Sequence, residues 1–208
     1  MNQWQQNELP FLHLTDGYLF PGLPSKYVIQ IKSIEVTEKW LFNFPLLGVV
    51  NIPLNKLHPP QRIAYGILNQ IKAIDKDIYQ LEINGLGIAQ MTRIYQKEKM
   101  NLCQAYELEY NQKILPQNSF RMKRLNHFCE HFINNNIPRP DDRIYWKSII
   151  QTQQQKINFI SMLYLNKDDQ KHQVLSSDIN DQLEYLIDRL PSLKLQTNSK
   201  IMSFSFSN

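Results

Sequence analysis

The chain has 208 residues, of which 42% are hydrophobic and 20% are charged. These proportions are typical of a globular protein with one large domain or two small ones. The net charge of +4 is spread evenly along the chain, which argues against a nucleic-acid binder, because such proteins concentrate their cations on one stripe.

Two cysteines, Cys103 and Cys129, are too few for a disulfide framework and predict reduced thiols in a cytoplasm. The start, MNQWQQNELP, has no signal-peptide pattern, and no apolar segment approaches the roughly 20 residues that cross a membrane.

The first half of the chain predicts short β-strands. Glycines and prolines punctuate its apolar runs, a turn is expected at Asp75–Asp77, and Gly85 and Gly87 are expected to hinge two strands. Lys32–Leu41 has loosely helical spacing. The predicted strand regions are Tyr27–Ile31, Pro45–Pro53, Arg62–Ile74, Ile78–Tyr95 and Cys103–Tyr110. Many short strands of this kind favour a small barrel or a sandwich over a doubly wound sheet.

After Asn111–Phe120 the period becomes helical. Residues 119–136 predict a helix with an apolar stripe, and 138–165 predict a second run that opens with two prolines and an Asp141 or Asp142 cap. Two short helices are expected in 166–190. The stripe of the first helix is Phe120, Leu125, Phe128, Cys129 and Phe132, and the second run continues with Ile144, Ile149, Ile150, Ile157, Ile160 and Leu163. We therefore expect a β subdomain in 1–115, a helical subdomain in 116–195 and a flexible tail in 196–208.

No catalytic, cofactor or metal motif emerges. His127 and His131 have the i, i+4 spacing of a helical metal pair, but a helical wheel places them opposite the apolar stripe, which indicates a solvated face. None of the six glycines is followed by lysine, so there is no P-loop. The sequence also lacks a G-x-S-x-G elbow. We therefore expect a protein that is not an enzyme and that needs no cofactor or metal.

Aromatic side chains are concentrated in the first 45 residues, around a turn-rich loop. Aromatic residues beside an open strand edge suit the recognition of extended or unfolded peptide. The alternative is that most of them belong to the core. The candidate peptide-binding residues are Tyr18, Phe20, Tyr27, Trp40, Phe42 and Phe44.

Two segments resemble signatures of the Lon protease N-terminal domain. The opening of that domain has an LP-x-LPL strand, a loop ending in L/V-FPG, an apolar strand and a K/R-x-S-I/L helix start. This sequence has a similar segment, LPFLHLTDGYLFPGLPSKYVIQIKSIEVTEKW. YGILNQIKAI and the following DIYQLEINGLG are similar to the next signature of that domain. The matching residues are Leu9, Pro10, Leu12, Leu14, Leu19, Phe20, Pro21, Gly22, Lys32, Ser33, Ile34, Gly66, Leu68, Ile71, Gly85 and Leu86. A third segment, LNKDDQKHQVLSSDINDQLEYLIDRL, resembles the closing helices of stand-alone Lon-domain proteins. The likeness therefore spans most of residues 9–190. His13 stands where the family usually has proline, and no arginine-rich run follows Gly87.

The resemblance implies an α+β fold, with a PUA-like small β-barrel subdomain followed by an α-helical subdomain. In full-length Lon this region helps to recognise and hold protein substrates, and this sequence has neither the ATPase nor the Ser/Lys protease motifs. The resemblance therefore implies a stand-alone, proteolysis-related module in the cytoplasm. Its expected partners are unfolded or extended protein segments or a protein partner, with no membrane. The alternative is RNA binding, for which PUA-like folds are used elsewhere. The cations from Arg121 to Lys147 would then contact the RNA backbone.

Overall fold

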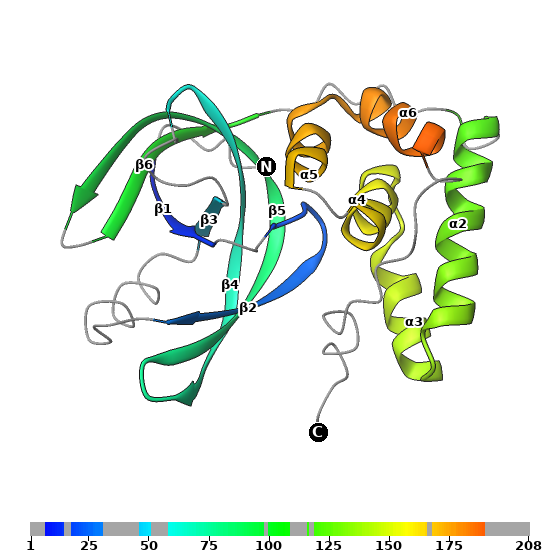
Figure 1. Cartoon of the computed structure of the whole chain (residues 1–208), viewed down its shortest axis with the longest axis horizontal. Coiled ribbons are helices and arrows are strands. Elements are labelled where there is room, and N and C mark those ends of the chain that lie inside the picture. The colour runs from blue at the N-terminus through cyan, green and yellow to red at the C-terminus, as the bar shows by residue number, and fades with distance from the viewer. Residues whose placement is uncertain are drawn as a thin grey trace. The chain divides into compact units, whose positions relative to one another are not determined.

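A computed structural model describes residues 7–14, 18–30, 46–50, 58–97, 100–108, 116, 119–165 and 168–189. The chain divides into two compact units, Met1–Glu109 and Tyr110–Asn208. Among the described residues, the first unit holds the strands and the second holds the helices (Figure 1).

The described strands of the first unit form one mixed sheet that closes on itself. They are β1 (Asn7–His13), β2 (Pro24–Gln30), β3 (Leu46–Val50), β4 (Gln61–Asp75), β5 (Ile78–Lys97) and β6 (Met100–Glu107). Their order is β2-β5-β4-β3-β1-β6, and β5 also pairs with β6, so every strand except β2 takes part in a ring. β1 is parallel to β3, and the other pairs are antiparallel. A ring of strands followed by helices confirms the predicted α+β class.

The hairpin of β4 and β5 extends beyond the strands of the ring. The first half of β5, from Ile78 to Asn84, pairs with β2, whereas the second half, from Ala89 to Lys97, pairs with β6. β4 pairs with β3 only at residues 64–67. Strand β2, residues 68–75 of β4 and residues 78–84 of β5 therefore form a three-stranded extension, which we call the arm. In Figure 1 the hairpin runs past the ring to its turn at the lower edge of the view.

Strand β5 is continuous, although the sequence predicted two strands hinged at Gly85 and Gly87. Tyr65 pairs with Gly87 and Gly66 pairs with Gly85, so that Leu86 is an extra residue in β5. This arrangement is a β-bulge, which bends a strand without ending it. The glycines therefore mark a bend between the ring and the arm.

The loop Leu19–Leu23 docks on Gly85 and fixes the start of β2. The Gly22 amide donates to the Gly85 carbonyl (2.9 Å), and the Gly85 amide donates to the Leu23 carbonyl (3.0 Å). A Cβ atom on Gly85 would lie 2.2 Å from the carbonyl oxygen of Phe20, so only glycine permits this approach. Gly22 has φ 78°, in the left-handed region that glycine favours. The two segments that resemble Lon signatures thus contact each other directly.

Alternating residues of the ring strands fill the barrel with apolar side chains, as expected for strands with one face toward a core. The buried cluster comprises Leu9, Phe11, Val50, Ile63, Tyr65, Ala89, Met91, Cys103 and Ala105. Residues from β1, β3, β4, β5 and β6 contribute, so this core holds the ring together.

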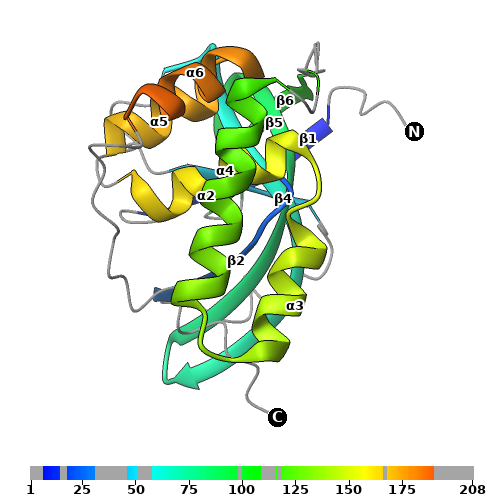
Figure 2. The same cartoon turned by 90° about the vertical axis from the view of Figure 1, so that its right-hand side faces the viewer.

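The second unit packs its helices around aromatic rings. Its described helices are α2 (Phe120–Asn136), α3 (Pro140–Ile149), α4 (Gln153–Tyr164), α5 (Asp168–Ser176) and α6 (Ile179–Arg189). Figure 2 shows α2 and α3 side by side. The ring of Phe159 lies 5.7 Å from that of Phe132 and 5.2 Å from that of Trp146, measured between centroids. All three side chains are buried, so they join α2, α3 and α4 in one core.

Several helical predictions are wrong in detail. Leu125, Cys129 and Phe132 are buried as predicted, but Met122 and Ile133 complete the stripe. Phe120 is 74% exposed because it begins the helix, and Phe128 is only half-buried.

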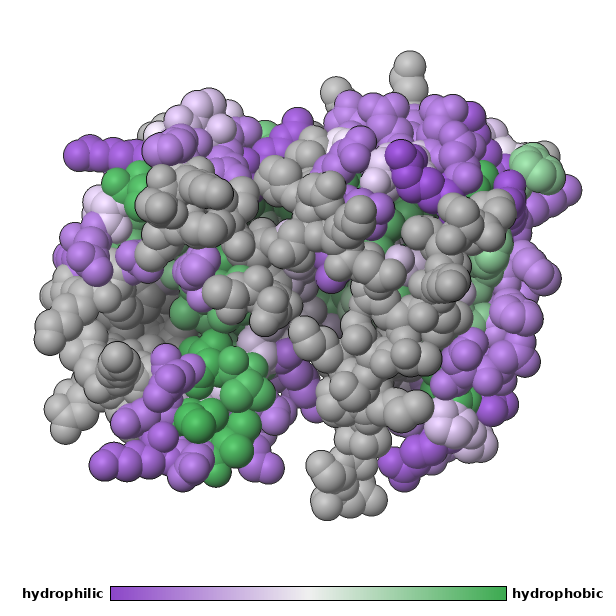
Figure 3. All heavy atoms as spheres, in the orientation of Figure 1, coloured by the Kyte–Doolittle hydropathy of each residue, from purple (hydrophilic) through white to green (hydrophobic). Residues whose placement is uncertain are grey.

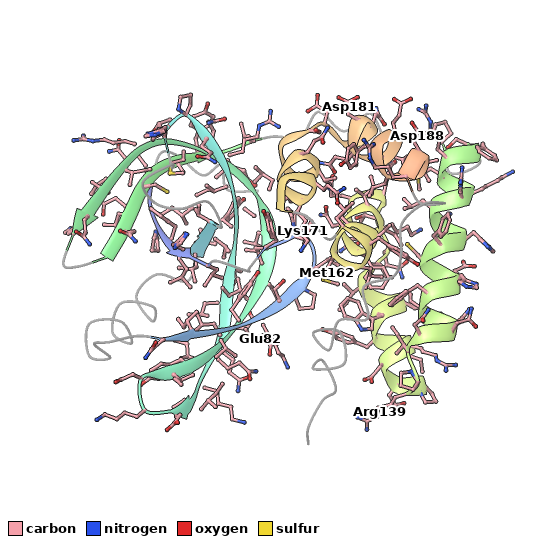
Figure 4. The ribbon with its side chains drawn as sticks, viewed as in Figure 1. Glu82, Arg139, Met162, Lys171, Asp181 and Asp188 are labelled. Atoms are coloured by element: carbon pink, nitrogen blue, oxygen red, sulfur yellow. The ribbon has the colours of Figure 1, made fainter. Side chains whose placement is uncertain are left out.

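The predicted run in 138–165 is two helices rather than one. Thr152 and Gln155 form a capping box that starts α4 as a separate helix. Ile144 belongs to the shorter α3 and lies on the solvated face of that helix. Helix α3 starts at Pro140 after Arg139, without the predicted side-chain cap from Asp141 or Asp142. Figure 4 shows Arg139 at this end of the helix.

Candidate functional site

One face of the arm is almost wholly apolar. Residues that pair directly across antiparallel strands place their side chains on the same face, so the register defines three rows. They are Ser25, Ile83 and Leu68; Tyr27, Leu81 and Ile71; and Ile29, Tyr79 and Ala73. We call this surface the apolar face. Side chains of its central strand β5 are buried, whereas Tyr27, Ile29 and Ile71 are half-buried and Ala73 is exposed. The two outer strands therefore present apolar surface to solvent.

The opposite face of the arm is mostly polar. Lys26 Nζ lies 3.6 Å from Glu82 Oε2, an ion pair between paired residues of β2 and β5. Glu82 is labelled on the arm in Figure 4. Gln80 and Lys72 occupy the next row, and Val28 is the apolar exception, 65% exposed. An amphipathic three-stranded arm is thus attached to the ring.

Apolar surface continues to the tip of the arm. Ile74 lies at the third register shift of the β4–β5 pair, between Ala73 and Asp75, and is 53% exposed. Figure 3 shows hydrophobic side chains gathered near the lower end of the arm. Exposed apolar patches on a folded protein commonly mark contact sites for partners.

Tyr27 is the predicted site residue that belongs to the apolar face. Its hydroxyl is buried and has no hydrogen-bond partner of good geometry among the described residues. Burial raises the pKa of the Tyr27 phenol above its ordinary value, and the Ser25 side chain opposes that shift. The ring is therefore neutral at physiological pH and acts as an apolar group.

The other predicted aromatic residues lie elsewhere. Phe20 is 1% exposed and belongs to the core. Tyr18 is half-buried, with its ring centroid 6.5 Å from that of Phe20. Trp40, Phe42 and Phe44 lie outside the described residues. The structure thus brings Tyr18 to Phe20, and neither residue belongs to the three rows of the apolar face.

Sequence reasoning missed the aliphatic members of the apolar face, chiefly Ile29, Ile71 and Ala73. Alternation is regular in β5 from Ile78 to Asn84 and could have located the face there. Register shifts within β4 interrupt its alternation, so the pattern of that strand is hidden in the sequence.

Comparison with solved structures decides the fold. The chain matches the N-terminal domain of the Lon protease of the Mycobacterium avium complex, with a TM-score of 0.66 and 15% identity, over 88% of this chain and 97% of that one. It also matches a Lon N-terminal domain protein from Xanthomonas campestris, with a TM-score of 0.64 and 12% identity, over 88% of this chain and 98% of that one. The chain has the fold of the Lon protease N-terminal domain. No protein-family model and no curated protein matches the sequence.

The histidine pair of this Lon-like chain lies on a solvated face of α2, as predicted. The ring centroids of His127 and His131 are 6.0 Å apart, and His131 Nδ1 is 3.0 Å from Asn135 Nδ2. In the described part of the chain, no group of three or more His, Cys, Asp or Glu side chains could hold a metal ion. The described helices include none that is both long and apolar enough to span a membrane.

Three of the cations between Arg121 and Lys147 have partners within the chain. Arg121 Nη2 lies 2.6 Å from Glu184 Oε1, and Arg143 Nε donates to the Ile137 carbonyl at 2.5 Å. The Arg124 guanidinium lies 6.0 Å from the centroid of the Phe128 ring. These contacts give no particular support to the RNA alternative, which needs cations directed at a phosphate backbone.

Both thiols of the Lon-like chain are buried. The Cys103 thiol contacts the Leu9 carbonyl (3.4 Å) inside the barrel, and Cys129 is buried in α2. Burial raises the pKa of the Cys103 thiol from an ordinary 9.0 to about 12. Burial likewise raises the pKa of Cys129 to about 12, with Lys156 acting in the opposite direction. The thiolate, which is the reactive form, is therefore scarce in the folded protein.

We expect both cysteines to resist thiol reagents at pH 8 until the chain unfolds. A rise of this size reduces the thiolate fraction about a thousandfold, and burial blocks access in addition. Ellman titration in buffer and in denaturant measures the effect, and rapid native labelling of either thiol would contradict it.

The same two thiols make stability depend on pH. Because the pKa values of both thiols are higher in the folded chain than in the unfolded chain, the unfolded chain releases these protons at a lower pH. The free energy of unfolding should therefore fall as pH rises from about 9 toward 12.

Proposed function

We propose that the chain is a non-enzymatic protein-binding module that binds unfolded or extended protein segments in the cytoplasm. The observation that carries the proposal is the apolar face of the arm, with its half-buried and exposed side chains on two outer strands. The resemblance to the Lon N-terminal domain supports it, because that region of Lon helps to hold protein substrates.

The apolar face suits segments that folded proteins keep inside. A bound segment would cover the exposed parts of Tyr27, Ile29, Ile71 and Ala73, and burial of apolar surface is the main source of affinity in such contacts. Folded proteins offer few contiguous apolar stretches at their surfaces. The preference for unfolded chains therefore follows from the chemistry of the face.

Fluorescence anisotropy with a labelled, reduced and carboxymethylated protein, which stays unfolded, tests the proposal. We expect Ala73→Asp to weaken binding about tenfold, because it places a charge on the apolar face at an exposed position. Gln70→Asp is the matched control, since it adds the same charge at an exposed position in the polar row of Lys26 and Glu82. We expect it to change binding by less than about twofold.

Absence of binding by the unmodified chain at high micromolar concentration would rule the proposal out. Equal losses for the two variants would show that charge, and not the apolar face, governs binding. Thermal unfolding of both variants checks that each remains folded.

A further inference from the structure

Asn84 and Gly85 form an Asn-Gly pair within β5. In such a pair the glycine nitrogen can attack the carbonyl carbon of the asparagine side chain, because no side chain on the glycine obstructs the approach. The Asn84 side chain is exposed, on the mostly polar face of the arm that also carries Glu82. The sequence therefore supplies both reacting groups, and water reaches the side chain that would lose ammonia.

The fold restrains the peptide bond that would have to move. The Gly85 amide donates its proton to the Leu23 carbonyl (3.0 Å), a bond that the attack must break. A Cβ atom on Gly66 would lie 2.2 Å from the Asn84 carbonyl oxygen. On the next residue, a Cβ atom would lie 2.2 Å from the Phe20 carbonyl oxygen. Strand β4 and the docked loop thus hold this peptide in an extended strand, and ring closure requires it to rotate out of that conformation.

Unfolding removes these restraints and permits the reaction. The Gly85 nitrogen forms a bond to Cγ of Asn84, and the bond from Cγ to Nδ2 breaks. Ammonia leaves with the proton that the Gly85 nitrogen has lost. Water then opens the resulting five-membered succinimide at either carbonyl, which gives aspartate or isoaspartate. Water is the one co-reactant, and no atom is oxidised or reduced.

The isoaspartate product does not fit the folded chain. It adds one carbon atom to the main chain between Cα of Asn84 and the nitrogen of Gly85. The backbones of Gly66 and Phe20 already approach this peptide so closely that one added carbon would lie 2.2 Å from a backbone oxygen. A longer main chain at this point would therefore displace the docked loop and the start of the arm.

We propose that Asn84 is a site of deamidation that the docked loop Leu19–Leu23 protects in the folded chain, and that its isoaspartate product prevents the loop and the arm from re-forming. A chain that unfolds for long enough then carries a covalent change that keeps it from returning to the native state. The inference is independent of the proposed binding function, because it concerns the backbone at the bend and not the apolar face.

Peptide mapping by mass spectrometry tests the protection. Samples in buffer and in guanidinium chloride are incubated at pH 8, and deamidation of each asparagine is followed with time. We expect Asn84 to react at least about tenfold more slowly in buffer, because the reaction must wait for the loop to open. Asn69 is the internal control. It is exposed in β4, but the side chain of Gln70 obstructs the attacking nitrogen, so we expect little reaction in either sample.

Gly22→Ala tests the role of the loop. Gly22 has φ 78°, which strains alanine, and its amide donates to the Gly85 carbonyl (2.9 Å). We expect deamidation of Asn84 in buffer to become about tenfold faster in this variant, and unchanged in denaturant. Phe159→Ala is the control, because it weakens the core of the helical unit. We expect it to change the rate by less than about twofold.

Refolding of the separated products tests the effect of isoaspartate. Ion exchange isolates the deamidated chains, and thermal unfolding follows their return to buffer. We expect the isoaspartate chain to refold poorly, or with a Tm more than about 6 °C lower than that of the unmodified chain. Asn84→Asp is the matched control, since it carries the same charge on a main chain of normal length. We expect its Tm to lie within about 3 °C of that of the unmodified chain.

Each contrary result overturns a stated part of the proposal. Equal rates in buffer and in denaturant would overturn the protection. Equal accelerations in Gly22→Ala and Phe159→Ala would assign the protection to global folding and not to the loop. An isoaspartate chain with the Tm of the unmodified chain would overturn the incompatibility. If Asn84 stays intact in denaturant, the site itself is disproved.

Discussion

Gly85→Ala is expected to lower the free energy of unfolding by about 3 kcal/mol, because it adds an atom where the backbone is closest. The new Cβ would lie 2.2 Å from the Phe20 carbonyl oxygen and 2.9 Å from its carbonyl carbon. Neither backbone atom can rotate away, so the loop Leu19–Leu23 must move. That movement also breaks its two hydrogen bonds with Gly85. Urea unfolding followed by circular dichroism measures the loss, which corresponds to a fall of roughly 6–12 °C in Tm.

Gly87→Ala is the matched control, two residues along the same strand. There the nearest atoms belong to the Tyr65 side chain, at 3.0–3.2 Å, and a side chain can shift by a few tenths of an ångström. We expect a cost of about 1 kcal/mol or less. If Gly85→Ala were as stable as the unmodified chain, the docking of the loop on β5 would be disproved.

Phe159→Ala is expected to cost about 3–5 kcal/mol in the helical unit. Its ring is fully buried and contacts the rings of Phe132 and Trp146. Truncation leaves a cavity among three helices, which cannot collapse without separating their contacts. Urea unfolding followed by the near-ultraviolet circular dichroism of the aromatic core gives the change.

Phe120→Ala makes the same chemical change at a position that is mostly exposed. We expect its effect to stay within about 0.5 kcal/mol of zero. Similar losses for the two variants would mean that Phe159 is not in the packed core that the structure describes.

Much of the fold was predictable because its determinants are local. Alternating residues mark β5, and the turn after Asp75 is marked by its charged residues. The break between α3 and α4 was also readable, since Thr152 and Gln155 have the spacing of a capping box. The longer apolar pattern of the segment concealed that signal. Continuity of β5 through Gly85 and Gly87 depends on the bulge at Leu86, which only the pairing with β4 reveals.

The candidate site was only partly predictable. A concentration of aromatic residues does not tell which of them are buried, and Phe20 is in the core whereas Tyr27 is on the arm. The partners of Tyr27 across the sheet, Leu81 and Ile71, are more than 40 positions away in the sequence, and register shifts in β4 separate their patterns. Long-range register is therefore the missing information. The resemblance to the Lon N-terminal domain supplied the order of elements without that register.

The two buried thiols give this chain a practical property. Because Cys103 and Cys129 lie inside the barrel and the helical core, a new surface cysteine would be the position that reagents modify first. Ser148→Cys, on the exposed side of α3, would accept a fluorophore without prior removal of the natural cysteines. A second dye at Gln70→Cys would then place one label on each unit. The distance between the labels, followed by energy transfer in solution, would measure the separation of the two units.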